Sequence, residues 1–210
     1  MVTIMTLIIA AISKNGVVIR SDKRRKVMDA SGLIQYYDDM KKVFISSDKR
    51  TIIYNHGINI IKGRSWYDLA IKSENAIRQG GAADVDAALN KVEEVISAEA
   101  LAEISNNQLA DLCAFVVILK TRGNTWEAGE ISWKRGQGIK KSRLGRIILS
   151  GSGSKYVRPN NKQWRNDYWA SIGRNEAKVQ IGMLYAFAIK NQNNAQGDEF
   201  SPSYDDVMVT

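Results

Sequence analysis

The sequence predicts an α+β fold in which two antiparallel sheets lie between helical layers, an αββα arrangement. The order of the elements favours it: two β-rich hairpins come first, two segments with helical periodicity follow, and the chain then returns to strands before a last helix. Sheets and amphipathic helices each need a partner for their apolar face, so this order fits packed layers. No internal repeat or low-complexity linker interrupts the chain, and residues 1–210 are therefore predicted to form one domain.

The first hairpin is predicted within Thr6–Arg24, TLIIAAISKNGVVIRSDKR, with its turn at Lys14-Asn15-Gly16. Asn and Gly tolerate the positive φ that a tight turn between two β-branched runs needs. Antiparallel pairing about this turn places Thr6 opposite the region of Asp22, so that a hydroxyl and a carboxylate share one edge of a sheet. Polar residues are also ordinary at strand ends, and the pairing alone supports either interpretation.

The second hairpin joins the β-rich runs Lys41–Ile45 and Thr51–Asn55 through the polar turn Ser46–Arg50. Folding the two runs on each other predicts that Lys42 lies opposite Gly57. The two hairpins then bring a hydroxyl, a carboxylate, an ammonium and a glycine to strand ends. If these ends share one rim, the set has the parts of a nucleophilic site.

Helical periodicity begins at Ser65 and continues through Ile77 to the Gly80-Gly81 pair, which predicts a first helix that ends there. Asp84 is typical of an N-cap, and a second helix with one apolar face is predicted after it. The pattern continues through Ala98–Ile104, either in the same helix or as a second segment. These helices are expected to pack on a sheet, and they carry no functional signal.

The second half of the chain returns to strands. Cys113–Lys120 is a continuous apolar run, typical of a strand covered on both faces, and Thr125–Trp133 can pair with it through a Gly-Asn turn. Arg146–Ser150 predicts a further strand, Asn175–Ile189 a helix with one apolar side, and Asp206–Thr210 a last short strand.

The segment Lys134–Arg146, KRGQGIKKSRLGR, is strongly basic and punctuated by glycine. It is interpreted first as a solvated loop of a basic protein and second as a nucleic-acid contact. The segment lacks interleaved aromatic residues, which weakens the case for base stacking. A nucleic-acid-binding role through Lys140, Lys141 and Arg143 is kept as the third functional hypothesis.

A Gly151-Ser152-Gly153 turn follows the strand that ends at Ser150. Together with the first hairpin, the Ser21-Asp22-Lys23-Arg24 run, the Lys41-Lys42-Val43 run and the later Gly57, it resembles proteasome β-subunits and the peptidase subunit of the bacterial ATP-dependent ring protease. Those enzymes are N-terminal-nucleophile threonine proteases. The resemblance implies their four-layer αββα sandwich, without a cofactor or a metal ion.

The resemblance also implies roles for individual residues. Thr6 would be the nucleophile once residues 1–5 are removed, because its free α-amine, with an ordinary pKa of about 7.7–8.0, could then act as the base. Lys42 would favour the alkoxide and keep the amine neutral, and Asp22 would hold the lysine charged and oriented. The backbone N–H of Gly57 would stabilise the oxyanion, and Ser152 would support the amine.

By the same resemblance the substrate is an unfolded polypeptide, and the subunits form a homo-oligomeric ring served by an ATP-dependent unfoldase. A second hypothesis is an inactive relative that keeps the extension 1–5 and assembles as a ring or scaffold. Arg20 stands where the family has a small residue, and His56 precedes the glycine of the oxyanion loop. After its last helix, the family places an aspartate and a serine near the nucleophile. The nearest corresponding positions in this sequence are Asn193 and Gln196.

Composition agrees with one domain, since 44% of the 210 residues are hydrophobic. The net charge of +8 makes an acidic partner worth testing but on its own describes nonspecific attraction. The single Cys113 excludes an internal disulfide, and the single His56 excludes a His-rich metal site. His56 itself is expected to be a hydrogen-bonded residue at a strand end rather than a catalytic base. No apolar run has the length of a membrane span, and a cytoplasmic location is expected.

Overall fold

The computed structural model describes residues 6–28, 31–57, 60–61, 64–99, 113–134, 138–198 and 200–210. Contacts within the chain divide it into two compact units. Of the described residues, unit 1 holds 6–41 and 145–210, and unit 2 holds those between 42 and 144. That the two units form one domain stays a prediction.

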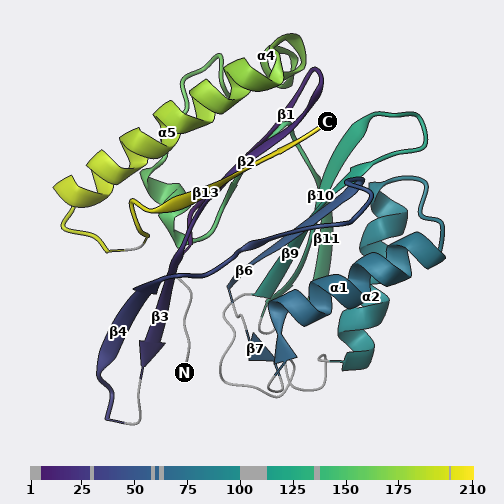
Figure 1. Ribbon diagram of the computed structural model, residues 1–210, viewed down its shortest axis with the longest axis horizontal. Coiled ribbons are helices and arrows are strands. Elements are labelled where there is room, and N and C mark those ends of the chain that lie inside the picture. The colour runs from purple at the N-terminus through teal and green to yellow at the C-terminus, as the bar shows by residue number, and fades with distance from the viewer. Residues whose placement is uncertain are drawn as a thin grey trace. The chain divides into compact units, whose positions relative to one another are not determined.

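Unit 1 is built on a four-stranded antiparallel sheet with the order β12-β1-β2-β13 (Figure 1). Its strands are β1 (Ile8–Ser13), β2 (Gly16–Asp22), β12 (Ile147–Ser150) and β13 (Tyr204–Val209). The predicted first hairpin is confirmed, since β1 and β2 pair from Ile8 with Ser21 to Ser13 with Gly16. Gly16 has a φ of 149°, and a Cβ there would come within 2.1 Å of the carbonyl oxygen of Val209, so only glycine fits this turn.

Helix α5 (Arg174–Asn194) lies along one face of the sheet in unit 1, together with the short α4 (Asn166–Ser171) and the 3-10 turn η1 (Ser152–Tyr156) (Figure 1). The predicted helix over 175–189 is confirmed and is longer at its C-terminal end. Its inward side chains form one core with alternate residues of the sheet and with α4: Leu7, Ile9, Ala11, Val18, Trp169, Ala177, Ile181, Leu184, Tyr185, Ala188 and Phe200. Helix α4 has only six residues, too few to show a helical period in the sequence.

A two-stranded ribbon of β3 (Arg24–Met28) and β4 (Ile34–Asp38) extends beyond the main sheet of unit 1 (Figure 1). No strands were expected here from the sequence. The Arg25 guanidinium binds the Asp39 carboxylate at 2.7 Å and lies 4.4 Å from the centre of the Tyr37 ring. The ribbon is therefore held partly by contacts between charged and aromatic side chains, which leave no clear pattern of hydrophobic alternation.

Unit 2 contains a five-stranded antiparallel sheet with the order β11-β10-β9-β6-β5. Its strands are β5 (Val43–Ile45), β6 (Thr51–Gly57), β9 (Cys113–Lys120), β10 (Trp126–Lys134) and β11 (Gly138–Leu144). The short strands β7 (Ile60–Ile61) and β8 (Arg64–Ser65) form a separate pair. The strands predicted at 113–120 and 125–133 are confirmed.

The second hairpin is confirmed, but its register differs from the prediction. Val43 pairs with Tyr54, and the same register aligns Lys42 with Asn55 rather than with Gly57. The N–H of Ser46 donates to the carbonyl of Thr51 at 2.9 Å, and this hydrogen bond at the turn sets the register of the two strands.

Helices α1 (Trp66–Gln79) and α2 (Val85–Glu99) lie side by side in unit 2 (Figure 1). Ser65 and Asp68 form a capping box at the start of α1, and Asp84 accepts a hydrogen bond from the N–H of Ala87 at 2.9 Å. Both helix starts and the end of α1 at Gly80 were predicted. The expected continuation through 98–104 lies, after Glu99, outside the described residues.

The structure confirms an α+β fold with antiparallel sheets. The four-layer order, which concerns both units together, stays a prediction. In the described part of the chain, none of the helices combines the length and the hydrophobicity needed to cross a membrane.

Candidate functional site

The backbone of Thr6, just before β1, lies against the turn that follows β12. Its N–H donates to Oγ of Ser152 at 3.4 Å, and its carbonyl accepts from the N–H of Gly153 at 3.0 Å. These partners are far apart in the chain, and the pairing of β1 with β12 brings them together. The role expected for Ser152, to support a free amine of Thr6, stays a prediction.

Glycine is required on both sides of Ser152. Gly151 has a φ of 87°, and a Cβ there would come within 2.1 Å of the carbonyl oxygen of Thr6. A Cβ on Gly153 would come within 2.6 Å of the Phe200 ring. The Gly-Ser-Gly sequence is thus explained by the close approach of this turn to Thr6 and to the segment after α5.

The carboxylate of Asp22 is completely buried at the end of β2. Its Oδ1 accepts from the N–H of Leu7 at 2.7 Å, and its Oδ2 accepts from the N–H of Arg24 at 2.9 Å. Two backbone donors therefore hold the carboxylate in place beside the residue that follows Thr6. Burial raises the pKa of the Tyr185 hydroxyl, and the negative charge of Asp22 raises it further.

The hydroxyl of Thr6 is buried, and Oγ1 makes no hydrogen bond to any residue in the described part of the chain. An unsatisfied buried hydroxyl costs on the order of 1–3 kcal/mol. Within unit 1, Thr6, Asp22 and Ser152 thus form a cluster in which the backbone nitrogen and the carboxylate are held, while the hydroxyl is without a partner among these residues.

The other two predicted site residues, Lys42 and Gly57, belong to unit 2 and are described there by themselves. Lys42 precedes β5 and is 2% exposed. Gly57 ends β6 with a φ of 98° and pairs with Cys113 of β9. Residues 1–5, whose removal the sequence analysis expected, lie outside the described residues.

Arg20 is engaged in a structural contact across β2 and β13. Its Nε and one terminal nitrogen donate to the two carboxylate oxygens of Asp206 at 2.7 and 2.8 Å, and the guanidinium lies 3.8 Å from the centre of the Tyr204 ring. Burial opposes the charge of Arg20, but the hydrogen bond and charge of Asp206 outweigh it, and the pKa of Arg20 is raised. The side chain holds β2 and β13 together.

His56 is a hydrogen-bonded residue near the end of β6, as predicted. Its Nε2 lies 2.9 Å from Oε2 of Glu130 on β10, and the imidazole is mostly buried. In the described part of the chain, no group of three or more His, Cys, Asp or Glu side chains could hold a metal ion.

After α5, the positions named from the sequence differ in burial from a serine that follows them. Asn193 and Gln196 are exposed at the end of the helix, whereas Ser201 is completely buried. The hydroxyl of Ser201 donates to Asp38 at 2.7 Å, and its carbonyl accepts from the hydroxyl of Tyr185 at 2.7 Å. Asp198 contacts Arg24, whose N–H binds Asp22.

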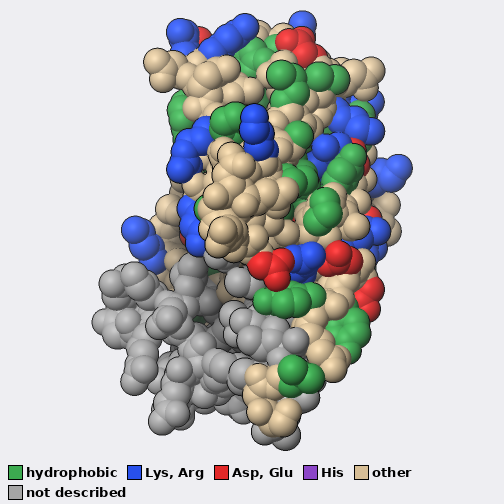
Figure 2. All heavy atoms as spheres, turned by 90° about the vertical axis from the view of Figure 1, so that its left-hand side faces the viewer, with side chains coloured by type: hydrophobic (Ala, Val, Ile, Leu, Met, Phe, Trp, Pro, Cys, Tyr) green, Lys and Arg blue, Asp and Glu red, His purple; other side chains and the backbone are tan. Residues whose placement is uncertain are grey.

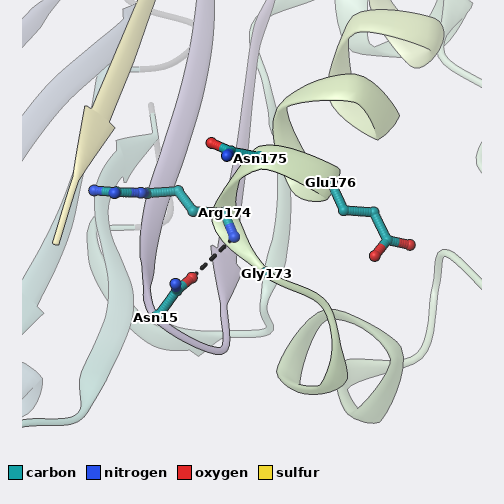
Figure 3. A pocket seen from close by; sticks show the side chains of 5 residues that line it. All are labelled: Asn15, Gly173, Arg174, Asn175 and Glu176. Atoms are coloured by element: carbon teal, nitrogen blue, oxygen red, sulfur yellow. Dashed lines mark hydrogen bonds between the residues drawn. The ribbon is translucent and has the colours of Figure 1, made fainter.

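A pocket of about 230 Å³ lies at the opposite end of β1, where the first hairpin turns (Figure 3). Asn15 accepts a hydrogen bond from the N–H of Arg174 at 2.9 Å, and the side chains of Arg174 and Glu176 point in opposite directions. Because Thr6 and Asn15 are at the two ends of β1, this pocket is separate from the Thr6 cluster.

The basic segment 134–146 was predicted as a loop, and this is wrong for most of it, because 138–144 forms the edge strand β11. Lys141 binds Glu93 at 2.5 Å and Arg143 binds Asp86 at 2.7 Å, both on α2. Residues 135–137 lie outside the described residues. On the face shown in Figure 2, Lys and Arg side chains are dispersed among other groups.

No known family profile matches the sequence, and no curated protein matches it. Solved structures do match. Anbu (ancestral beta-subunit) from Yersinia bercovieri has a TM-score of 0.59 at 10% identity, over 97% of this chain and 81% of that chain. The chain has an Anbu-like fold.

Two further Anbu structures agree with this finding. One is described as a helical assembly of the Anbu complex from Pseudomonas aeruginosa, with a TM-score of 0.52, 14% identity, and 96% of this chain and 80% of that chain covered. The other is an Anbu (Gly-1) mutant from Hyphomicrobium sp. strain MC1, with a TM-score of 0.56 and 12% identity, over 97% of this chain and 80% of that chain.

These matches correct the resemblance drawn from the sequence. The sequence was found to resemble proteasome β-subunits and the bacterial ring-protease peptidase subunit, whereas its structural neighbours are Anbu (ancestral beta-subunit) proteins, whose fold it shares. The physical reason is that the quoted motifs are a hairpin turn and close backbone approaches. Such features describe a fold, and they do not separate families that share it.

Proposed function

We propose that this chain is a subunit of a threonine peptidase that uses an N-terminal nucleophile, Thr6. The observation that supports it is the cluster in unit 1: the backbone nitrogen of Thr6 lies 3.4 Å from the Ser152 hydroxyl, the Asp22 carboxylate is held by two backbone N–H groups, and the Thr6 hydroxyl has no hydrogen-bond partner in the described part of the chain. A hydroxyl beside a nitrogen with a fixed hydrogen-bond partner is the arrangement that such a mechanism needs.

The proposal requires removal of residues 1–5, because a peptide nitrogen cannot accept a proton. The freed α-amine, with an ordinary pKa of about 7.7–8.0, takes the hydroxyl proton as Oγ1 attacks the carbonyl carbon of a peptide bond. The C–N bond breaks, the amine returns the proton to the leaving group, and an ester joins the substrate to Thr6. Water then hydrolyses the ester and restores the hydroxyl.

Lys42 and Gly57 are proposed as the remaining parts of the site. The ammonium of Lys42 would favour the developing alkoxide, and the N–H of Gly57 would donate to the oxyanion, where loss of one such donor costs on the order of 10²–10³ in rate. Both residues belong to unit 2, so their roles rest on the sequence. The αββα order of layers is proposed on the same basis, the sequence.

The proposed substrate is an unfolded polypeptide, and the proposed working form is a homo-oligomer. The described helical assembly of the Pseudomonas aeruginosa Anbu complex, a protein of similar fold, supports self-association of this chain. A closed ring and an ATP-dependent unfoldase partner stay predictions from the sequence.

A non-catalytic assembly subunit is the second candidate. The observation that favours it is that Thr6 is preceded by residues 1–5 in this chain, so that its nitrogen is a peptide N–H as it stands. An oligomer of this kind would retain the extension and hydrolyse no peptide.

The test is the N-terminus and activity of the full chain after expression. Intact mass should show a chain that begins at Thr6, and hydrolysis of fluorogenic peptides should fall about a thousandfold or more in Thr6→Ala, because removal of a nucleophile abolishes the covalent route. Thr3→Ala is the matched control, since Thr3 would be lost with the extension. Undiminished hydrolysis by Thr6→Ala refutes the assignment, and an assembled, inactive protein that retains residues 1–5 supports the second candidate.

A further inference from the structure

A pocket of about 430 Å³ lies within unit 2, where three connections meet. They are the turn between β5 and β6, the end of α1, and the turn between β9 and β10. Its apolar lining includes Ile77 and Leu119, both nearly buried. Its charged lining consists of four cationic and two acidic side chains: Arg50, Arg78, Lys120, Arg122, Asp48 and Glu74.

In the described part of the chain, some cations have a carboxylate nearby and others do not. Arg20, Lys141 and Arg143, for example, each lie within 4.0 Å of a carboxylate. Among the described residues, no such carboxylate partner is found for three of the cations that line the pocket: Arg50, Lys120 and Arg122. The fourth, Arg78, has Glu74 at 3.5 Å.

Two of these arginines are held in place by backbone carbonyls. One terminal nitrogen of Arg50 donates to the carbonyls of Lys120 at 3.0 Å and Thr121 at 2.8 Å, and one terminal nitrogen of Arg122 donates to the carbonyl of Gly81 at 3.1 Å. A guanidinium carries five N–H donors in a rigid fork. Each arginine therefore keeps further donors for a ligand, in an orientation that is already set.

The acidic side chains reduce the positive charge without cancelling it. Burial raises the pKa of Asp48, but hydrogen bonds from the Ser46 hydroxyl and the Arg50 N–H, with the charges of Arg50 and Arg78, outweigh it, and the pKa is lowered. Asp48 is thus ionised, and with Glu74 it leaves two positive charges in excess among the lining residues. Arg122 covers the carbonyl of Gly81, just after α1. This contact does not explain why Arg50, Lys120 and Arg122, which have no carboxylate partner among the described residues, line the same pocket.

We propose that this pocket binds a small ligand through an oxyanion, either a carboxylate or a phosphate group, held by Arg50, Lys120 and Arg122. Arginine forks match both groups because two parallel N–H donors meet two oxygens. The volume lies within the roughly 300–1,000 Å³ typical of small-molecule sites, so the ligand has an organic part that contacts Ile77 and Leu119. All of these residues belong to unit 2, and the proposal is independent of the peptidase function.

The test is calorimetric titration of the full-length protein with phenyl phosphate and with benzoate, which present the two oxyanions on the same ring. Saturable binding of at least one probe is expected, about tenfold weaker or more in Arg122→Gln and in Lys120→Gln, since each loses a charged donor. Arg165→Gln is the matched control, because Arg165 is an exposed arginine of unit 1. This variant should bind both probes with the affinity of the wild type.

The preferred probe identifies the source of the oxyanion, phosphate or carboxylate. Thermal unfolding of each variant without ligand shows whether it is folded, and Lys120→Gln tests the pocket without removing a hydrogen bond to the backbone. Absence of binding to both probes overturns the proposal. The proposal is also overturned if probe binding is weakened equally in Arg165→Gln and in the pocket variants. That result would show that the probes are attracted by the overall charge alone.

Discussion

The ion pair between Arg20 and Asp206 offers a direct test of how unit 1 is held together. Asp206→Asn keeps the shape of the side chain but leaves the Arg20 charge without its carboxylate. The two side chains are only 11% and 19% exposed, so the unpaired charge is poorly solvated. Breaking a buried pair costs about 3–5 kcal/mol, and the partial exposure here indicates the lower end, about 3 kcal/mol.

Urea unfolding followed by tryptophan fluorescence measures this change, and thermal unfolding should show a Tm lower by roughly 6–12 °C for a chain of this size. Asp167→Asn is the matched control, because Asp167 also pairs with an arginine but both side chains are exposed, at 68% and 65%. Adding Arg20→Met to Asp206→Asn should recover much of the loss, since no buried unpaired charge remains; Lys178, which also contacts Asp206, is exposed to solvent. Equal stability of Asp206→Asn and the wild type would refute the reasoning.

The same pair predicts a dependence on pH. Burial opposes ionisation of Asp206, but the hydrogen bond and charge of Arg20 outweigh it, so the folded pKa lies below its ordinary value. A lowered carboxyl pKa contributes stability above the unfolded pKa of about 3.9, and this contribution is lost as the pH falls through the folded value. The stability difference between the wild type and Asp206→Asn should therefore be full at pH 6 and shrink below pH 4. A difference that stays constant down to pH 3 would contradict it.

Two further substitutions test the packing around the Thr6 cluster. Gly151→Ala should lower the free energy of unfolding by at least about 1–3 kcal/mol, because the positive φ strains alanine and its Cβ would strike the carbonyl of Thr6; an unchanged Tm would contradict this. Gln192→Leu should lower the free energy of unfolding by about 2–3 kcal/mol, because the Gln192 side chain binds both the N–H and the carbonyl of buried Phe200. Chemical denaturation measures this change. A loss below half of the expected value would show that other groups replace these hydrogen bonds.

Much of the local structure follows from residues close together in the chain. The Asn15-Gly16 turn, the helix start at Ser65, the cap at Asp84 and the apolar run of β9 were all predicted, since turn chemistry, capping and periodicity depend on near neighbours. The prediction failed where local pattern was weak. The basic strand β11 has no hydrophobic alternation, and its Lys141 and Arg143 side chains pair with acidic side chains of α2, which only packing brings near.

The candidate site was predicted in part for the same reason. Asp22 was placed near Thr6 because one hairpin joins them, whereas Ser201 was missed because its contacts with Asp38 and Tyr185 depend on how the segment after α5 returns to the sheet. The register of the second hairpin was misjudged because the position of a polar turn is only weakly specified by its composition.

The sequence by itself determined the α+β class, the first hairpin and the starts of α1 and α2, whereas the roles of the candidate site residues stay predictions. Only the tertiary structure decided that the nitrogen of Thr6 meets Ser152, that Arg20 pairs with Asp206, and that Arg50, Lys120 and Arg122 line one pocket. The physical reason is distance along the chain: a turn or a cap is fixed by a few adjacent residues, but contacts between remote segments arise from strand register and side-chain packing, which no local pattern encodes.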